Sequence, residues 1–390
     1  MKKLFNIAAL LLAAVIAGAA LAGCGENGSL YLIPEPTYTV TFDSNGGSEV
    51  ASQTVTNGQK ATKPEAPTKT GDKTSYVFLG WYNGTAAYDF DSPVTANITL
   101  TAKWLEGFVK VEGGTYDGSA PLTPASEVFI VGRSITIPTL YVCDHEVTQG
   151  EYETYCNYGW NPPSDDYGKG ANYPVYRVDW YDVVVYCNLR TIAEFGEAEC
   201  VYSLNGKAHP KDWTGIVEET GDNAGKYNGP FDQTSTWDYT GESDSDGGVL
   251  FDPSKKGYRL PTEAEWEYIA RNKNQDNFTY SGSDTLDDVA WHSQNSGGKA
   301  HEVKTTTKAN GLGIYDMSGN VWEWCHDWYG SIDSSTDQLG SSSGTKRVNR
   351  GGCYEDGNTN YCSVGNRSKI YDAPESHKRA IGFRVVRTAQ

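Results

Sequence analysis

The chain has 390 residues, which is enough for two or three domains. Its 38% hydrophobic and 21% charged residues are typical of a folding chain and exclude an overall disordered or coiled-coil protein. The 32 Lys and Arg against 50 Asp and Glu give a net charge of −18, and such a surface repels phosphate backbones. We therefore expect no nucleic acid among its partners.

The N-terminal segment predicts export. Two lysines follow Met1, an apolar stretch comes next, and the stretch ends in Leu21-Ala22-Gly23-Cys24. This order is typical of a secretory signal peptide, with a simple membrane anchor as the alternative. The ending resembles the bacterial lipobox, which implies that residues 1–23 are removed and that Cys24 carries the lipid, an acyl chain such as palmitate. We expect an exported protein anchored by lipid at the outer membrane or cell surface, with residues 24–37 as a tether.

The remaining cysteines do not form a recognisable metal or redox motif. Export permits disulfides, and an odd number leaves at least one thiol unpaired within the monomer. No Cys-x-x-Cys pair occurs and the six His are scattered, so neither a zinc site nor thioredoxin-type chemistry is expected. The seven are Cys143, Cys156, Cys187, Cys200, Cys325, Cys353 and Cys362.

Residues 38–104 predict a small β module. Strand-like runs at 38–42, 76–82 and 98–104 are separated by turn residues and a polar stretch, without a helical period. The strings Val40-Thr41-Phe42-Asp43-Ser44-Asn45-Gly46-Gly47, Phe78-Leu79-Gly80-Trp81-Tyr82 and Leu100-Thr101-Ala102-Lys103-Trp104 resemble the Listeria–Bacteroides (internalin B-type) repeat of bacterial surface proteins. The resemblance implies a β-grasp-like fold that serves as a spacer or, alternatively, as an adhesive unit.

Residues 105–390 predict an α+β domain with much irregular structure. Thr148 with Glu151 and Thr262 with Glu265 fit the capping box that begins a helix, and a third helix begins near Asp179. Residues 204–256 are rich in Gly, Asp, Asn and Thr and predict long surface loops.

One group of charged residues near the second capping box has two interpretations. Glu263 and Glu267 could divide acid and base roles, as paired carboxylates do. They also lie one helical turn apart, where Arg259 can pair with either. We favour the structural role.

The large domain contains a series of distinctive strings. Among them, in this order, are Arg259-Leu260-Pro261-Thr262-Glu263, Ser318-Gly319-Asn320-Val321-Trp322-Glu323-Trp324, Arg350-Gly351-Gly352 and Gly382-Phe383-Arg384-Val385-Val386. Together these strings resemble the formylglycine-generating enzyme (sulfatase-modifying factor) family. The resemblance implies a C-type-lectin-like fold with little regular secondary structure. In true members two thiolates bind Cu(I), which activates O₂ to oxidise a substrate cysteine.

The second of these strings predicts a structural calcium site. A glycine turn that exposes carbonyl groups, followed by a carboxylate, supplies the hard oxygen ligands that Ca²⁺ prefers. Family members hold calcium at this motif, which nominates Gly319, Val321 and Glu323, with Asn320 as a helper. The alternative is a buried Glu that hydrogen-bonds to the backbone.

The segment after Gly352 departs from the family at its copper site. Cys353 occupies the position where true enzymes have Ser. Asp356 replaces the first copper-binding cysteine, and Tyr361 replaces the second. Asp is a hard ligand that suits Cu(I) poorly, so we expect no bound copper and interpret the oxidase site as absent. Cys353 and Cys362 are the candidates if the chain is an enzyme, and they could instead form a disulfide or a shifted metal pair.

The residues around this site predict a binding surface. Tyr among small polar residues is typical of antibody paratopes, although an ordinary polar loop has the same composition. The layout also resembles surface lipoproteins whose lectin-fold segment is diversified by retroelements. However, several positions of this segment hold Glu or Lys, which adenine-directed variation of Asn codons does not produce. The nominated residues are Tyr354, Glu355, Asp356, Asn358, Asn360, Tyr361, Tyr371 and His377.

These patterns favour a cell-envelope protein whose large domain is non-catalytic and binds a protein or glycan, with loop 204–250 as a possible neighbour of the site. Replacing Tyr354 and Tyr361 with Ala is then expected to abolish binding without unfolding. The rival hypotheses are a copper- or iron-dependent oxidase acting on exported sulfatases and a purely structural envelope protein. The sequence leaves the oligomeric state open.

Overall fold

The computed structural model describes residues 21–24, 30–32, 34–158, 162–213, 216–218, 221, 224, 226–228, 248–367 and 376–389. Contacts divide the chain into two compact units. The small unit contains the residues up to Gly71 and Tyr76–Glu106, and the large unit contains Asp72–Ser75 and Gly107–Gln390. The expected signal peptide, as far as residue 20, lies outside the described residues.

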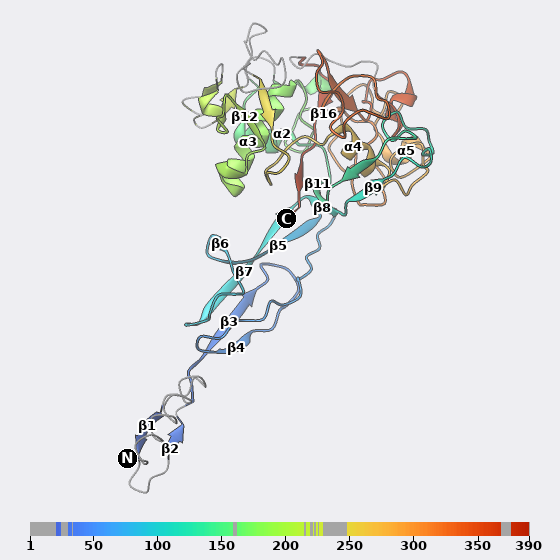
Figure 1. Ribbon diagram of the computed structural model, residues 1–390. Helices are drawn as coiled ribbons and strands as arrows, with labels where there is room; N and C mark the ends of the chain where they lie inside the picture. The colour runs from blue at the N-terminus through green and yellow to red at the C-terminus, as the bar shows by residue number, and fades with distance from the viewer. Residues whose placement is uncertain are drawn as a thin grey trace. The chain divides into compact units, whose positions relative to one another are not determined.

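The small unit is built around a five-stranded sheet of order β4-β3-β7-β5-β6 (Figure 1). Strand β3 pairs in parallel with β7, and the other neighbours are antiparallel. Val40, Trp81 and Leu100 alternate with exposed side chains and are at most 2% exposed, so they form its core. The three expected strands are confirmed. The strands are β3 (Thr37–Asp43), β4 (Gln53–Thr56), β5 (Tyr76–Asn83), β6 (Ala86–Ala87) and β7 (Ile98–Glu106), and a separate pair joins β1 (Leu21–Cys24) to β2 (Leu30–Leu32).

The large unit has short strands in several small sheets. Among the described residues, two sheets have three strands, with orders β19-β11-β8 and β17-β16-β18, and three further sheets are pairs: β10-β9, β12-β15 and β13-β14. The strands are β8 (Phe108–Val111), β9 (Gly114–Tyr116), β10 (Ile135–Ile137), β11 (Leu140–Cys143), β12 (Tyr202–Leu204), β13 (Val217–Glu218), β14 (Tyr227–Asn228), β15 (Val249–Phe251), β16 (Trp322–Trp328), β17 (Arg347–Arg350), β18 (Ile381–Gly382) and β19 (Val386–Thr388).

The helices of the large unit begin where the capping residues predict. Thr148, Asp179 and Thr262 each accept a hydrogen bond from the backbone N–H three residues later, and each forms a complete capping box. The helices are α2 (Gln149–Tyr155), α3 (Trp180–Phe195), α4 (Glu263–Ala270) and α5 (Leu286–Val289), with 3₁₀ turns at Asp165–Tyr167, Glu197–Glu199, Pro210–Asp212 and Thr359–Cys362. Helices and small sheets within one unit confirm the α+β class.

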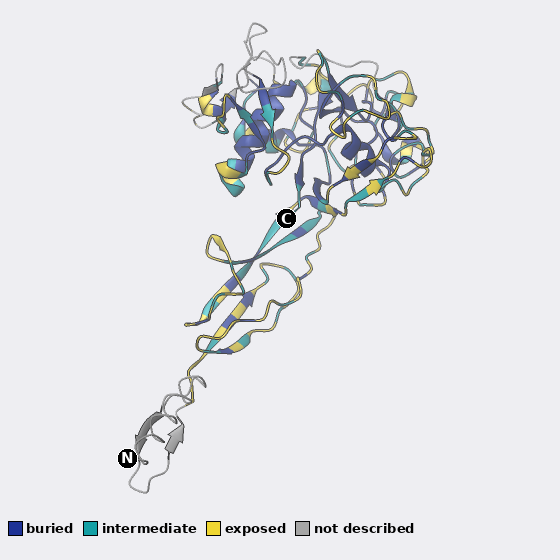
Figure 2. Cartoon of the chain, in the orientation of Figure 1, coloured by how far each residue is buried: buried dark blue, intermediate teal, exposed yellow. Residues whose placement is uncertain are grey.

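The core of the large unit surrounds α4 and β16, which are buried along their whole length (Figure 2). Trp266 and Ile269 of α4 pack in one cluster with Met317 and Val348. Many buried residues are charged: seven arginines are at most 2% exposed, so their guanidinium groups need partners inside the protein. Those partners define much of the geometry around the nominated site residues.

Candidate functional site

The calcium motif forms a turn that leads into β16. Gly319 and Asn320 have φ angles of 80° and 59°, in the left-handed region that Gly and Asn tolerate best. Glu323 follows on β16 and is 0% exposed. Its carboxylate accepts hydrogen bonds from Arg384 Nε at 2.7 Å, Arg384 Nη2 at 2.5 Å and Trp266 Nε1 at 2.8 Å. Glu323 is therefore one half of a fully buried ion pair.

A second buried carboxylate organises the turn itself. Glu146 accepts hydrogen bonds from Asn320 Nδ2 at 2.6 Å and from the Val321 backbone N–H at 3.0 Å. The side-chain oxygen of Asn320 accepts the His301 backbone N–H at 2.9 Å. Burial, together with the charges of Asp316 and Glu323, raises the pKa of Glu146 well above its usual range. The motif thus serves as a hydrogen-bonded hub of the fold.

These contacts do not fit the calcium ligand set nominated from the sequence. Both oxygens of Glu323 are engaged by Arg384, and the guanidinium charge would lie beside a bound cation. The carboxylate is buried and hydrogen-bonded, as in the alternative interpretation, but its partners are side chains instead of backbone groups. Calcium at this motif stays an untested prediction.

The pKa of Asp316 gives the hub a pH dependence. Burial raises this pKa from 3.8 to about 6. Its Oδ2 accepts the Lys304 backbone N–H at 2.8 Å, while its buried Oδ1 has no partner within the described part of the chain. Because the folded-state pKa exceeds the unfolded one, Asp316 contributes stability that is full below pH 3.8 and is lost as the pH rises through about 6.

Replacing Asp316 with Asn is therefore expected to raise the free energy of unfolding at pH 7.5 by up to about 3 kcal/mol and to leave it nearly unchanged at pH 4. Asn tolerates the φ of 60° at this position and keeps an acceptor for Lys304. Urea unfolding at the two pH values measures the effect, with the exposed Asp165→Asn as a matched control. An equal effect at both pH values would contradict the assignment.

The two candidate catalytic cysteines are buried free thiols. Cys353 is 1% exposed and Cys362 is 0% exposed, and neither forms a disulfide. Burial, with a further contribution from Asp356, raises the pKa of Cys362 to about 12 and that of Cys353 well above its usual range. Asp356 accepts a hydrogen bond from the Cys353 backbone N–H at 2.9 Å. Both thiols are thus protonated at neutral pH, whereas Cu(I) binds thiolates.

Tyr354 belongs to the core, and its assignment to the ligand surface is wrong. The side chain is 0% exposed, and its hydroxyl donates to the Arg379 carbonyl at 3.2 Å. Its backbone N–H donates to the Asn320 carbonyl at 2.8 Å, and its carbonyl accepts from Ser296. The composition of the segment indicated an exposed aromatic residue, but the contacts place it beneath the calcium motif's turn.

Other nominated residues do lie at the surface. Glu355, Asn358 and Asn360 are exposed, Asp356 is half-buried, and Tyr361 is half-buried with its ring 5.9 Å from that of Trp322. Glu355 forms an ion pair with Arg379 at 2.7 Å. Tyr371 lies outside the described residues, as does much of loop 204–250. We call Glu355, Asn358, Asn360, Tyr361 and Arg379 the polar face.

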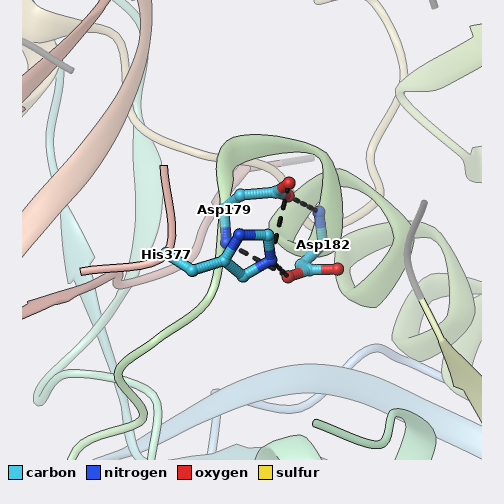
Figure 3. Close-up of side chains that lie close together, drawn as sticks. All are labelled: Asp179, Asp182 and His377. Carbon is cyan, nitrogen blue, oxygen red and sulfur yellow. Dashed lines mark hydrogen bonds and ion pairs between the residues drawn. The ribbon is translucent and has the colours of Figure 1, made fainter. Parts of the chain in front are cut away.

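His377 lies against helix α3 (Figure 3). Its Nε2 is 3.2 Å from Asp182 Oδ2 and 3.7 Å from Asp179 Oδ2. His377 was predicted to lie on the ligand surface, and the histidines show no metal-ligand spacing in the sequence. The cluster could not be predicted because the two aspartates lie far along the chain from His377, and only the tertiary fold joins them.

The charged residues around α4 have structural partners. Arg259 pairs with Glu265 at 2.6 Å, so the expected partners Glu263 and Glu267 were wrong. Glu263 accepts two hydrogen bonds from Arg367, at 2.7 and 2.8 Å. Glu267 bridges Arg271 and Arg350. All of these carboxylates are buried in ion pairs, which supports the structural interpretation.

Two cavities open on other parts of the large unit. One, of about 390 Å³, is lined by Ile135, Phe251 and Leu339, among others. The second, of about 540 Å³, is more polar and is lined by Glu197, Lys207 and Asp252, among others. Neither is lined by a nominated ligand-binding residue. In the described part of the chain, no helix is sufficiently long and apolar to cross a bilayer.

Comparisons with known protein families match both units. Residues 96–389 match the family described as "Sulfatase-modifying factor enzyme 1-like domain", and residues 38–103 match the Listeria-Bacteroides repeat domain. Both resemblances expected from the sequence are thereby confirmed.

Two of the similar relatives carry different names. "Chaperone protein LppX" of Paenibacillus barcinonensis is 33% identical over 264 residues, which cover 63% of this chain and 78% of that protein. The formylglycine-generating enzyme of Streptomyces coelicolor is 34% identical over 151 residues, which cover 34% of this chain and 48% of the enzyme. The chain thus spans about half the length of the formylglycine-generating enzymes that it matches.

Solved structures show a similar fold. Treponema denticola variable protein 1 matches with a TM-score of 0.54 and 27% identity, over 73% of this chain and 96% of that one. CarF matches with a TM-score of 0.50 and 22% identity, over 73% and 98% of the two chains, which shows a shared fold alone.

Proposed function

Because this chain belongs to the family of sulfatase-modifying factor enzyme 1-like domains, we propose that it is an envelope-anchored binding protein. In this proposal the family fold presents a ligand surface and does not oxidise a substrate cysteine. The ligand is a protein, with a glycan as the alternative, and the polar face is the contact surface. The lipid on Cys24 anchors the chain to the membrane.

The proposal is supported mainly by the residues found where the family has its two copper-binding thiolates. Asp356 occupies the first of these positions and accepts a hydrogen bond from the Cys353 backbone. Both nearby thiols are buried and have raised pKa values, so thiolate formation costs free energy before any metal can bind. The free energy of Cu(I) binding would have to exceed that cost. This is unfavourable because a hard carboxylate replaces one of the two soft thiolate ligands.

The polar face has the properties of an adaptable contact surface. Glu355, Asn358 and Asn360 are exposed, and the Asn358 side chain accepts the Asn360 backbone N–H at 3.1 Å, which caps the turn that presents them. Arg379 pairs with Glu355 and packs over the ring of Tyr167 at 4.9 Å. Paired side chains of this kind are ordered before a partner arrives, which lowers the entropic cost of binding.

A relative that matches 63% of this chain favours a protein as ligand. It is named a chaperone protein. Similarity at 33% identity over 78% of that relative supports the proposal that this chain acts on another protein. A relative described as a putative membrane protein, 41% identical over 107 residues, supports a place at the envelope.

Site-specific photocrosslinking in intact cells tests the proposal. A photoreactive side chain at Asn358 or Asn360 is expected to yield a discrete adduct, whereas the same side chain at exposed Glu127, outside the polar face, yields none. A foreign peptide joined to the labelled position, identified by mass spectrometry, identifies a protein ligand, and loss of the adduct's mass shift on glycosidase treatment identifies a glycan. Equal labelling at all three positions, or none at any, would remove the polar face from consideration.

The alternative is a formylglycine-generating oxidase or a related oxidoreductase acting on exported sulfatases. Its support is the similarity to named formylglycine-generating enzymes, which is confined to about a third of this chain. Under this alternative Cys353 and Cys362 would have to bind copper as an unorthodox pair.

A further inference from the structure

The cluster at the start of α3 combines three residues that the fold brings together. Asp179 is the N-cap and Asp182 is the third residue of the helix, and each carboxylate accepts the backbone N–H of the other. His377 comes from the chain segment just before β18, and Figure 3 shows its imidazole facing both carboxylates. The cap hydrogen bonds use Asp179 Oδ1 and Asp182 Oδ2, so Asp179 Oδ2 is left for another role.

That remaining oxygen is the second observation. Asp179 is 1% exposed, and within the described residues its Oδ2 accepts no hydrogen bond. It lies 3.7 Å from His377 Nε2, on the side of the carboxylate that faces the cluster. A buried carboxylate oxygen without a donor is destabilising, so a native protein usually supplies a partner, which can be a protein donor, a water molecule or a metal ion.

The charges point to a cation. Asp179 and Asp182 are 1% and 3% exposed, and two carboxylates so close together repel each other strongly in a buried environment. A divalent ion would compensate the two negative charges and bind the imidazole in its neutral form.

The spacing and the ligand types suit a transition metal. Around a tetrahedral Zn²⁺ ion with bonds of about 2.0–2.1 Å, neighbouring ligand atoms lie about 3.4 Å apart. The separations of His377 Nε2 from Asp182 Oδ2 and Asp179 Oδ2 are 3.2 and 3.7 Å. An imidazole nitrogen favours Zn²⁺ and its neighbours in the first transition row over Ca²⁺ or Mg²⁺.

We propose that Asp179, Asp182 and His377 bind one divalent transition-metal ion, Zn²⁺ by its ligand types, with a fourth position open to water. The ion joins the N-terminus of α3 to the segment Ser376–Lys378. That segment also accepts a hydrogen bond at its Lys378 carbonyl from the Arg177 backbone N–H, and it leads directly to Arg379 of the polar face. Metal binding here does not depend on whether the polar face binds a ligand.

Metal titration of the purified full chain tests this site. After dialysis against a chelator, Zn²⁺ is added and binding is measured by calorimetry, and Co²⁺ is added in parallel for its visible spectrum. One ion per chain is expected. Binding is expected to be lost in His377→Ala, which removes the imidazole ligand, and in Asp179→Asn, which removes one negative charge. Asn still caps the helix, so the second variant is expected to fold. His209→Ala, which changes a His distant in sequence and at the start of a different turn, is expected to bind as the parent does.

Three outcomes would overturn the proposal. One is the absence of Zn²⁺ and Co²⁺ binding, which leaves the cluster as an ion pair. Another is binding that is unchanged in both variants, which puts the ion elsewhere. The third is a thiolate-to-cobalt charge-transfer band, which puts a cysteine among the ligands. Circular dichroism of each variant in chelator verifies folding, and the Co²⁺ spectrum of the parent decides the ligand type without any variant.

Discussion

Replacement of Arg384 with Met is expected to lower the free energy of unfolding by about 3–5 kcal/mol. Arg384 and Glu323 are both 0% exposed, and the guanidinium donates two hydrogen bonds to the carboxylate. The same guanidinium donates to the carbonyls of Cys143 at 3.1 Å and Tyr315 at 2.9 Å. Removing it leaves the buried Glu323 carboxylate with Trp266 Nε1 as a donor but without its counter-charge, and it removes the guanidinium donor from both carbonyls. Urea unfolding followed by tryptophan fluorescence measures the loss.

Two controls separate this pair from a general effect of charge removal. Arg379→Met removes an exposed arginine whose ion pair with Glu355 is largely solvated, so a loss of at most about 1 kcal/mol is expected. The double variant Arg384→Met and Glu323→Leu is expected to regain part of the loss, because it leaves no unpaired charge.

Added Ca²⁺ is expected to leave the urea midpoint of the parent protein unchanged. A midpoint that rises with Ca²⁺ would support the calcium site and contradict the ion-pair interpretation.

Tyr354→Ala is expected to destabilise the protein by about 3–5 kcal/mol, as does the truncation of other large buried aromatic residues. The side chain is 0% exposed, and its hydroxyl donates a hydrogen bond to the Arg379 carbonyl. Its removal therefore creates a cavity and removes that donor from the carbonyl. Tyr354→Phe keeps the ring and is expected to lose about 1 kcal/mol. The half-buried Tyr361→Ala is expected to lose clearly less than Tyr354→Ala. Similar losses for the two alanine variants would show that Tyr354 is not a core residue.

Local patterns predicted the regular elements well. The strands of the small unit follow from alternation, and the helix starts at Thr148 and Thr262 follow from capping boxes, because both signals act over a few residues. The order of the motifs predicted the family and the α+β class. These features depend on short-range physics or on whole strings of residues.

Irregular segments were less predictable, because burial there depends on contacts between distant parts of the chain. Tyr354 lies between polar residues, and nothing local indicates that it packs below the turn at Asn320. Arg259 pairs with Glu265 because the capping box already directs that carboxylate back toward the helix start. The cluster of His377 with two aspartates of α3 joins residues that no spacing rule connects.

The measurement that tests the central claim most directly is a Cu(I) titration of the reduced protein, followed by oxygen-dependent turnover of a cysteine-containing sulfatase-motif peptide. The formylglycine-generating enzyme of Streptomyces coelicolor serves as the positive control. We predict neither stoichiometric Cu(I) binding nor aldehyde formation, because Asp356 replaces one thiolate and burial keeps Cys353 and Cys362 protonated. Tight binding of one Cu(I) per chain with aldehyde formation would contradict the account and make the protein an oxidase.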